Sequence, residues 1–186
     1  MKKTEEPGDR RQRIAEAAIA VIARDGGRGL SHRAVDAELA LPVGSVSYYF
    51  RTRKALLDAA VARLVERDEQ DVRELMASLR KPVVPASLVR ELVKRWSQKE
   101  HRTWLCARFE LLLEAGREGP DHPLIAARRK FMAGTQQMFE GLGAKAPAVS
   151  ARRLIASVEG LLLDELFRAH SASVLDQAVT GLERWL

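Results

Sequence analysis

Hydroxyl, aromatic and cationic side chains gather in the segment LPVGSVSYYFRTRKALLDAA, residues 41–60. Two serines and two adjacent tyrosines lie there, just ahead of the cations Arg51, Arg53 and Lys54. Hydroxyls and cations bond phosphate oxygens, and hydroxyls and small apolar groups contact the edges of bases. The combination indicates contact with nucleic acid. The alternative is that the tyrosine pair is ordinary packing and that the cations form a solvated helix face.

The elements that position these side chains are predicted to be helices. Apolar residues recur every three or four positions and strand-like alternation is absent from the sequence, so the expected fold class is all-α. We expect about nine helices, at 9–24, 31–39, 42–48, 52–79, 88–99, 102–117, 121–141, 148–169 and 173–186. Residues 1–8 are expected to be a mobile tail. The prolines of RKPVVPAS at 80–87 should separate a small N-terminal unit from a larger bundle, with Ser87 as the next N-cap.

The helices expected at 31–39 and 42–48 flank an interrupted turn. Ser31 and Thr52 are suitable N-caps for the helices that follow them. Pro42 suits the first turn of a helix because its missing N–H needs no partner there. Two short helices around such a turn are the sequence form of a helix-turn-helix, whose second helix enters the major groove of DNA.

From Ile14 to Val65 the chain resembles the DNA-binding domain of the tetracycline-repressor (TetR) family of bacterial transcription regulators. The matching segments are RIAEAAIAVIARDG, LSHRAVDAELALPVGSVSYYF and RTRKALLDAAVARL. Within them Gly44, Phe50 and Lys54 stand where the family pattern has them. The all-helical remainder of the chain is similar to the family too.

Three positions depart from that pattern. Ala40 stands in the turn where glycine is usual, and a non-glycine residue in a left-handed turn costs about 1 kcal/mol. Ser47 replaces a more usual aromatic residue. Pro42 replaces the serine or threonine that often caps the recognition helix. The departures concern the individual base contacts rather than the fold.

The resemblance also implies a division of contacts within a DNA-binding domain at 9–54, which continues into a connecting helix at 52–79. The residues implied to anchor phosphates are Ser31, Tyr48, Tyr49 and Lys54. Those implied to face bases are Pro42, Val43, Ser45 and Ser47. Further donors beside Ser31 are His32 and Arg33. A lysine in the first turn of a helix is poorly placed for the helix dipole unless a phosphate docks at that helix start.

For residues 80–186 the resemblance implies dimerisation and the binding of a small effector. The segment at 148–169 is apolar on more than one face, and such a helix must bury both faces. The interface residues expected there and in the last helix are Leu154, Val158, Leu161, Leu162, Val179 and Leu182. The alternative is that both helices are interior to a single chain.

Aromatic residues and methionines between 96 and 139 could wall an apolar effector pocket that holds a few polar groups. The candidate lining residues are Trp96, Trp104, Arg108, Phe109, Phe131, Met138 and Glu159. Plain core packing is the alternative for each of them. Glu159 either faces a cationic ligand or pairs with a neighbouring arginine such as Arg152 or Arg168.

The charge of the chain and the motifs that it lacks exclude several classes of function. The net charge of +6 and the pI of about 9.8 favour a polyanionic partner, either nucleic acid or anionic lipid. The sequence shows no signal peptide and no apolar run of membrane-spanning length, and its single cysteine, Cys106, fits a reducing cytosol, so we expect a cytoplasmic protein without a membrane partner. The four histidines lack metal-ligand spacing, and P-loop and dinucleotide motifs are missing. We therefore expect no metal, no cofactor and no enzyme activity.

The expected function is an effector-responsive DNA-binding regulator. Repression is the expected mode: a homodimer binds a palindromic operator and a small ligand releases it. In the expected mechanism the ligand displaces the segment near 96–117, which acts on the helix at 52–79 and changes the spacing of two recognition helices. The alternative, from a different class, is a helical ligand-binding or protein-interaction bundle that does not bind DNA.

Overall fold

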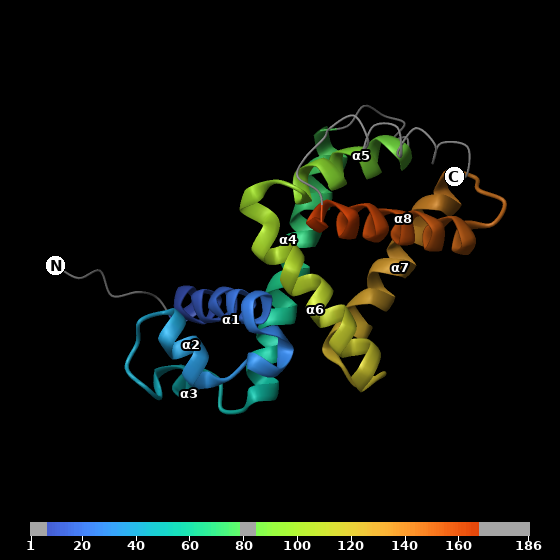
Figure 1. Ribbon diagram of the computed structural model, residues 1–186. Coiled ribbons are helices and arrows are strands. Elements are labelled where there is room, and N and C mark those ends of the chain that lie inside the picture. Colours follow the sequence, from blue (N-terminus) through green and yellow to red (C-terminus); the bar gives the residue numbers. More distant parts are fainter. Residues whose placement is uncertain (1–6, 79–84, 168–186) are drawn as a thin grey trace. The chain divides into compact units, whose positions relative to one another are not determined.

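The structure is a computed structural model that describes residues 7–78 and 85–167 (Figure 1). Its regular elements in those ranges are all helical, which confirms the all-α prediction. They are α1 (Pro7–Gly29), α2 (His32–Glu38), α3 (Ser45–Tyr49), α4 (Arg53–Ser78), α5 (Pro85–Trp96), a 3-10 turn (Lys99–His101), α6 (Arg102–Glu118), α7 (Pro123–Gly141) and α8 (Pro147–Phe167). Most of the predicted tail, much of the predicted break at 80–87 and the helix predicted at 173–186 lie outside the described residues.

The chain forms two compact units. The first comprises Met1–Asp68 and Thr103–Leu124, and the second comprises Glu69–Arg102 and Ile125–Leu186. Helix α4 belongs to the first unit up to Asp68 and to the second from Glu69. The first unit therefore contains the whole predicted helix-turn-helix together with nearly all of α6.

An apolar core holds the helices of the first unit together. Its buried side chains on α1 to α4 include Ile14, Ala18, Val21, Ile22, Val35, Val46, Leu56, Ala60 and Leu64. Their spacing along α1 and α4 is the three-to-four-residue period predicted from the sequence. Each fully buried Val, Leu or Ile contributes about 1.5–3 kcal/mol. The core thus fixes the packing of α2 against α1 and α3 (Figure 1).

The chain ends the regular part of α1 at a pair of glycines. Gly26 has φ 72° and ψ 173°, which interrupts the helical geometry. The N–H of Leu30 then donates to the carbonyl of Gly27 at 3.2 Å. Since a positive φ is unfavourable for residues that carry a Cβ, this geometry confirms the prediction that the glycines of 25–29 end the first helix.

Two predicted helix starts are wrong. Helix α3 begins at Ser45 rather than Pro42, because Gly44 has φ 94° and a left-handed residue cannot belong to a right-handed helix. Helix α5 begins at Pro85, so Ser87 lies inside this helix and is not its N-cap. Proline fits the first helical position, where no N–H is needed.

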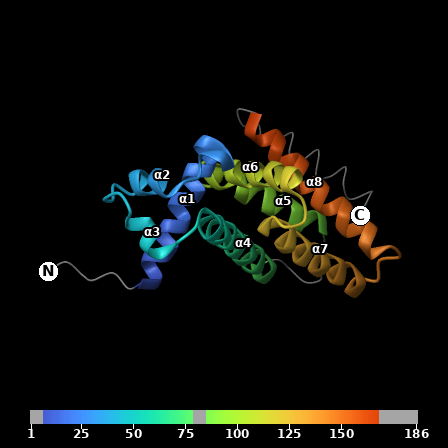
Figure 2. The same cartoon turned by 90° about the horizontal axis from the view of Figure 1, so that it is seen from below.

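In the second unit α5 packs against α8 (Figure 2). The buried apolar residues of this pair include Leu88, Val89, Leu92, Val93, Ala151, Leu154, Ile155, Val158 and Leu162. At the end of α5, Arg95 bonds the carboxylates of Asp71 at 2.8 Å and Glu74 at 2.6 Å, and its hydrogen bond holds the pKa of Glu74 below the ordinary value. Among the helices in the described ranges, none has both the length and the apolar character that crossing a bilayer requires.

Candidate nucleic-acid interface

Backbone hydrogen bonds close the turn between α2 and α3. The N–H of Ala40 donates to the carbonyl of Ala37 at 3.1 Å, and the N–H of Leu41 donates to the carbonyl of Asp36 at 2.8 Å. This is a Schellman motif, which needs a left-handed residue just after the helix, and Ala40 has φ 52°. The turn therefore keeps the geometry that usually takes glycine and carries a strain of about 1 kcal/mol at Ala40.

The side chain of Asp36 fixes the start of α3. It is buried, and its carboxylate accepts from the N–H of Gly44 at 2.8 Å and from the N–H of Val46 at 2.9 Å. The first N–H groups of a helix have no partner within the helix. Asp36 thus caps α3 from the neighbouring helix, because Pro42 cannot do so and Gly44 has no side chain.

Asp36 was not among the residues predicted to shape this site. Its position in the sequence could have revealed its role. Asp36 lies next to Val35, inside a short helix whose apolar side must be buried. A carboxylate on a buried side needs donors. A helix start supplies N–H donors and favours an adjacent negative charge, so the following helix was the natural partner.

Helix α3 presents large side chains to solvent. Val43, just before the helix, is 82% exposed, and Tyr48 is 75% exposed, whereas Val46 and Phe50 are buried beneath them. The ring of Tyr49 meets that of Tyr48 edge to face, with centroids 5.2 Å apart. We call the outward side chains of Pro42, Val43, Ser45, Ser47 and Tyr48 the α3 surface.

The polar candidates of the α3 surface differ in their bonding capacity. The hydroxyl of Ser45 donates to the carbonyl of Pro42 at 2.7 Å. Its oxygen remains able to accept, so it suits the amino group of cytosine or adenine in the major groove. Of the residues predicted to face bases, Pro42 and Val43 are exposed, whereas Ser45 and Ser47 are half-buried.

Two of the residues predicted to contact phosphate, Ser31 and Lys54, lie at helix starts. Ser31 and Thr52 each accept the backbone N–H three residues further on, at 3.1 Å and 3.0 Å, which confirms both predicted N-caps. Lys54 is exposed and pairs with Asp58 at 3.0 Å. An exposed ion pair of this kind contributes at most about 1 kcal/mol. A phosphate at the start of α4 could therefore displace Asp58 at little cost.

His32 has a structural bond that the sequence did not reveal. Its Nε2 lies 2.6 Å from the carbonyl oxygen of Phe50. Because a carbonyl only accepts, Nε2 carries the proton and donates it, which joins the start of α2 to the end of α3. The Nε2–H group of His32 is therefore already used in a bond within the protein. The neighbouring Arg33 is exposed.

Arg53 is exposed, yet its guanidinium has partners within the protein. Its guanidinium donates to the carbonyl of Leu30 at 3.2 Å, to the carbonyl of Gly27 at 2.6 Å and to Glu114 Oε1 at 3.2 Å. The arginine therefore joins three parts of the first unit: the start of α4, the segment between α1 and α2, and α6. The charge pattern of the sequence gave no indication of these partners.

The seven predicted effector-pocket residues divide between the two units. In the first unit, the guanidinium of Arg67 lies over the ring of Trp104, 4.2 Å from its centroid, and Arg108 bonds Asp68. Phe109 is half-buried on the same helix, α6. These three candidates all belong to α6, and their role as an effector site stays a prediction.

The second unit holds the other four candidates, which are Trp96, Phe131, Met138 and Glu159. The indole N–H of Trp96 donates to Asp71 at 2.7 Å, and Phe131 is 39% exposed. Glu159 accepts from both terminal nitrogens of Arg128, one of them at 2.8 Å, and these hydrogen bonds hold the pKa of Arg128 above its ordinary value. Glu159 thus pairs with an arginine, but the partner is Arg128 and not Arg152, and the other arginine considered, Arg168, lies outside the described residues.

The six predicted dimer residues fall into three groups: Leu154, Val158 and Leu162 are buried, Leu161 is half-buried, and Val179 and Leu182 lie outside the described residues. Helix α8 also leaves Val149 near its start and Leu163 and Phe167 near its end exposed, at 49%, 41% and 82%. Leu163 and Phe167 are four positions apart, so they share one side of the helix. We call this pair the α8 strip.

Known proteins that are similar to this chain include several transcriptional regulators. The sequence profile described as "Tetracyclin repressor-like, C-terminal domain" matches residues 80–184. No curated protein sequence matches the chain. A transcriptional regulator from Rhodococcus sp. Rha1 has the same fold, with a TM-score of 0.75 over 94% of each chain at 20% identity.

Two solved structures are similar in sequence as well. A TetR-family member from Streptomyces coelicolor A3 is 31% identical, with a TM-score of 0.71 over 94% of this chain and 98% of that chain. The multidrug binding protein EbrR, complexed with ethidium, is 30% identical, with a TM-score of 0.68 over 98% of this chain and 100% of that chain. The profile spans more than half of the sequence and these relatives span nearly all of it. The chain therefore belongs to the TetR family of transcriptional regulators.

Proposed function

We propose that the chain is a homodimeric repressor that binds a palindromic operator through α3 and leaves it when a small effector binds. The observation that carries the proposal is the α3 surface. Val43 and Tyr48 are large side chains in water that contribute nothing to the core, yet the backbone beneath them is held by the buried carboxylate of Asp36. In a major groove the same side chains would meet base edges and thymine methyl groups.

The surroundings of the α3 surface suit the phosphate backbone. The hydroxyl-capped helix starts at Ser31 and Thr52 offer N–H groups and a favourable dipole to an anion. Lys54 and Arg33 are exposed cations near those helix starts. A recognition helix between two phosphate contacts is the docking arrangement of helix-turn-helix proteins.

Effector control is supported by EbrR, whose structures hold ethidium, proflavin and malachite green. We propose a small organic molecule as the effector of this chain too. To release DNA it must bind the DNA-free conformation more tightly. The bond from Arg53 to Glu114 gives a route by which a shift of α6 would reach the start of α4.

The test of the proposal is the salt dependence of DNA binding. Duplex fragments from upstream of the chain's own gene are titrated, and the dissociation constant is followed by fluorescence anisotropy. The logarithm of the affinity is expected to fall linearly with the logarithm of salt concentration. Lys54→Ala is expected to weaken binding to every sequence and to reduce that slope by about one, because one phosphate contact is lost.

The matched control is Lys145→Ala, which removes an exposed lysine outside the α3 surface and is expected to leave the slope unchanged. If the chain bound no duplex even at low salt, the other class of function would stand: a helical bundle without DNA-binding activity. Equal losses in both variants would mean that Lys54 acts only through net charge.

A separate prediction concerns the dimer. The chain is expected to sediment as a dimer at micromolar concentration, and Leu163→Glu with Phe167→Glu is expected to give a monomer with unchanged helical circular dichroism. Both residues are exposed in the single chain, so the charges disturb an interface and not a core. Leu142→Glu, at a residue 46% exposed outside α8, is the control. A wild-type monomer would overturn the dimer, and a dimeric double variant would exclude the α8 strip from the interface.

A further inference from the structure

Three arginines lie close to Phe50, the C-cap residue of α3. The guanidinium of Arg11, near the start of α1, lies 5.1 Å from the centroid of the Phe50 ring. The carbonyl oxygen of Phe50 accepts from His32, the residue that precedes Arg33 on α2. Arg51 follows Phe50 directly in the chain. Helix α1, helix α2 and the link between α3 and α4 therefore each carry an arginine close to the end of α3.

Two of these arginines, Arg11 and Arg51, are exposed and lack an acidic partner. Neither forms a side-chain ion pair or hydrogen bond with another residue in the ranges that the structure describes. The guanidinium of Arg11 makes only a cation–π contact with Phe50, which contributes about 0.5–1 kcal/mol at an exposed site. The folded chain therefore leaves both positive charges available to an external anion.

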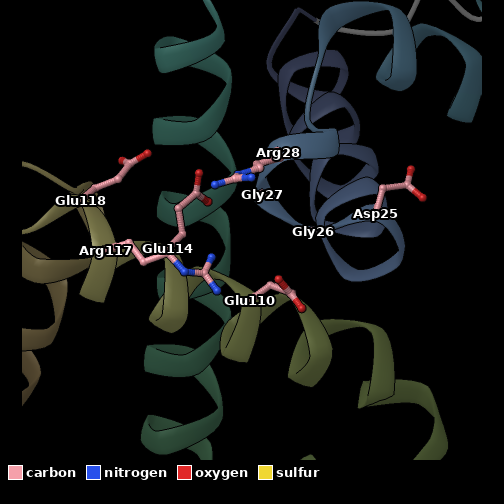
Figure 3. Close-up of a pocket in the computed structure, with 8 residues that line it drawn as sticks. All are labelled: Asp25, Gly26, Gly27, Arg28, Glu110, Glu114, Arg117 and Glu118. Carbon is pink, nitrogen blue, oxygen red and sulfur yellow. The ribbon is translucent and has the colours of Figure 1, made fainter.

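Arginines in other parts of the first unit lie among carboxylates. Arg63 pairs with Glu16 at 2.7 Å. At the opposite end of α1 from Arg11, Arg28 lines a pocket together with Arg117 of α6 and four carboxylates (Figure 3). The charges of these arginines are compensated within the unit, whereas those beside Phe50 are not. An anion that binds the first unit is therefore attracted to the end of α3.

We propose that Arg11 and Arg51 bind backbone phosphates of the operator, a role that rests on the proposed DNA binding. A guanidinium can bond a phosphate through two parallel N–H groups. Neither arginine lies on α3, the helix proposed to enter the major groove. Both therefore meet the strand that borders the groove, where contacts fix the position of a protein without reading bases.

The stacking on Phe50 prepares Arg11 for this contact. The ring holds the planar guanidinium in one orientation, so less side-chain entropy is lost when a phosphate binds. Phe50 is itself buried and belongs to the core beneath α3. Helix α1 thereby joins α2 and α4 as an element that positions the α3 surface on the duplex.

The test compares Arg11→Ala with Arg51→Ala against the wild type, by fluorescence anisotropy with the upstream fragment and with an unrelated duplex of equal length. The double variant is expected to bind both duplexes about tenfold to thirtyfold more weakly at about 0.1 M salt. The slope of log affinity against log salt is expected to fall by about two per chain, because two phosphate contacts are lost. Arg117→Ala with Arg129→Ala removes the same charge from exposed positions on α6 and α7 and is expected to keep the wild-type slope.

A single substitution separates charge from orientation. Arg11→Lys keeps the positive charge but loses the planar group that stacks on Phe50. Its salt slope is expected to equal that of the wild type, while its affinity falls about twofold to fivefold, the equivalent of one cation–π contact. Both replaced side chains are exposed, so circular dichroism is expected to show wild-type helix content in every variant.

The outcomes distinguish this proposal from the proposed function. A wild-type chain that binds neither duplex removes both. Wild-type binding with an unchanged slope in the Arg11 and Arg51 double variant leaves operator binding in place and overturns only the phosphate contacts. A loss confined to the upstream fragment would assign the two arginines to base reading. An equal loss in the Arg117 and Arg129 variant would mean attraction to net charge alone, and either of these last results contradicts the proposal.

Discussion

Replacement of Asp36 by alanine is expected to lower operator affinity about a hundredfold and to destabilise the N-terminal helices. The change removes two hydrogen bonds to a buried carboxylate and leaves the N–H groups of Gly44 and Val46 without an acceptor. Hydrogen bonds to a charged group contribute about 1.5–3 kcal/mol each. A loss of about 3 kcal/mol in the free energy of DNA binding corresponds to about a hundredfold weaker affinity. Anisotropy with operator DNA and urea unfolding measure the two effects.

Two variants separate the role of this carboxylate from a general loss of charge. Asp36→Asn keeps one acceptor oxygen, so its affinity is expected to lie between those of the wild type and Asp36→Ala. Asp121→Ala removes an exposed aspartate of the same unit and is expected to change neither measurement. An Asp36→Ala variant with wild-type affinity and an unchanged urea midpoint would show that α3 does not depend on the Asp36 bonds.

The second large effect is expected at Gly27, where alanine should destabilise the first unit by about 1–3 kcal/mol, the usual cost of overpacking a filled site. The added Cβ would stand 1.9 Å from a buried oxygen of Glu114, so the Glu114 carboxylate must move away, which disturbs its 3.2 Å bond from Arg53. The same shift would strain the 2.6 Å bond from Arg53 to the Gly27 carbonyl. Thermal unfolding measures the loss.

A second substitution tests whether the Glu114 carboxylate causes the loss of stability in Gly27→Ala. Glu114→Ala removes the obstructing carboxylate, so Gly27→Ala is expected to cost much less in that background, which gives a favourable coupling energy in a double-mutant cycle. Gly116→Ala is the matched control, because an added Cβ there meets no atom within 4 Å and alanine favours a helix interior. A Gly27→Ala variant as stable as Gly116→Ala would contradict the close packing of Glu114 on the glycine.

The features that could be predicted from the sequence are local ones. Helical periodicity gave the helices, because burial of one side repeats along the chain. The N-caps at Ser31 and Thr52 were predictable since each cap bonds a group three residues away. The end of the first helix could be placed because glycine at a positive φ is a property of the residue itself.

The features that the sequence did not reveal depend on partners far along the chain. Asp36 bonds groups eight and ten residues away, in another helix. Glu159 and Arg128 are thirty-one residues apart and Arg53 and Glu114 sixty-one, so no periodicity links them. The start of α3 was misplaced because the left-handed Gly44 follows from the packing of the turn and overrides the preference of Pro42.

The brevity of α3 has an evolutionary consequence. An isolated helix needs roughly 12–15 residues to form in water, and α3 has 5. Its shape is supplied from outside, by Asp36 and by the buried Val46 and Phe50. Val43 and Ser47 contribute little to that shape. If they face bases as proposed, substitutions at these positions change target preference without loss of folding, and a duplicated regulator can acquire a new target sequence through them.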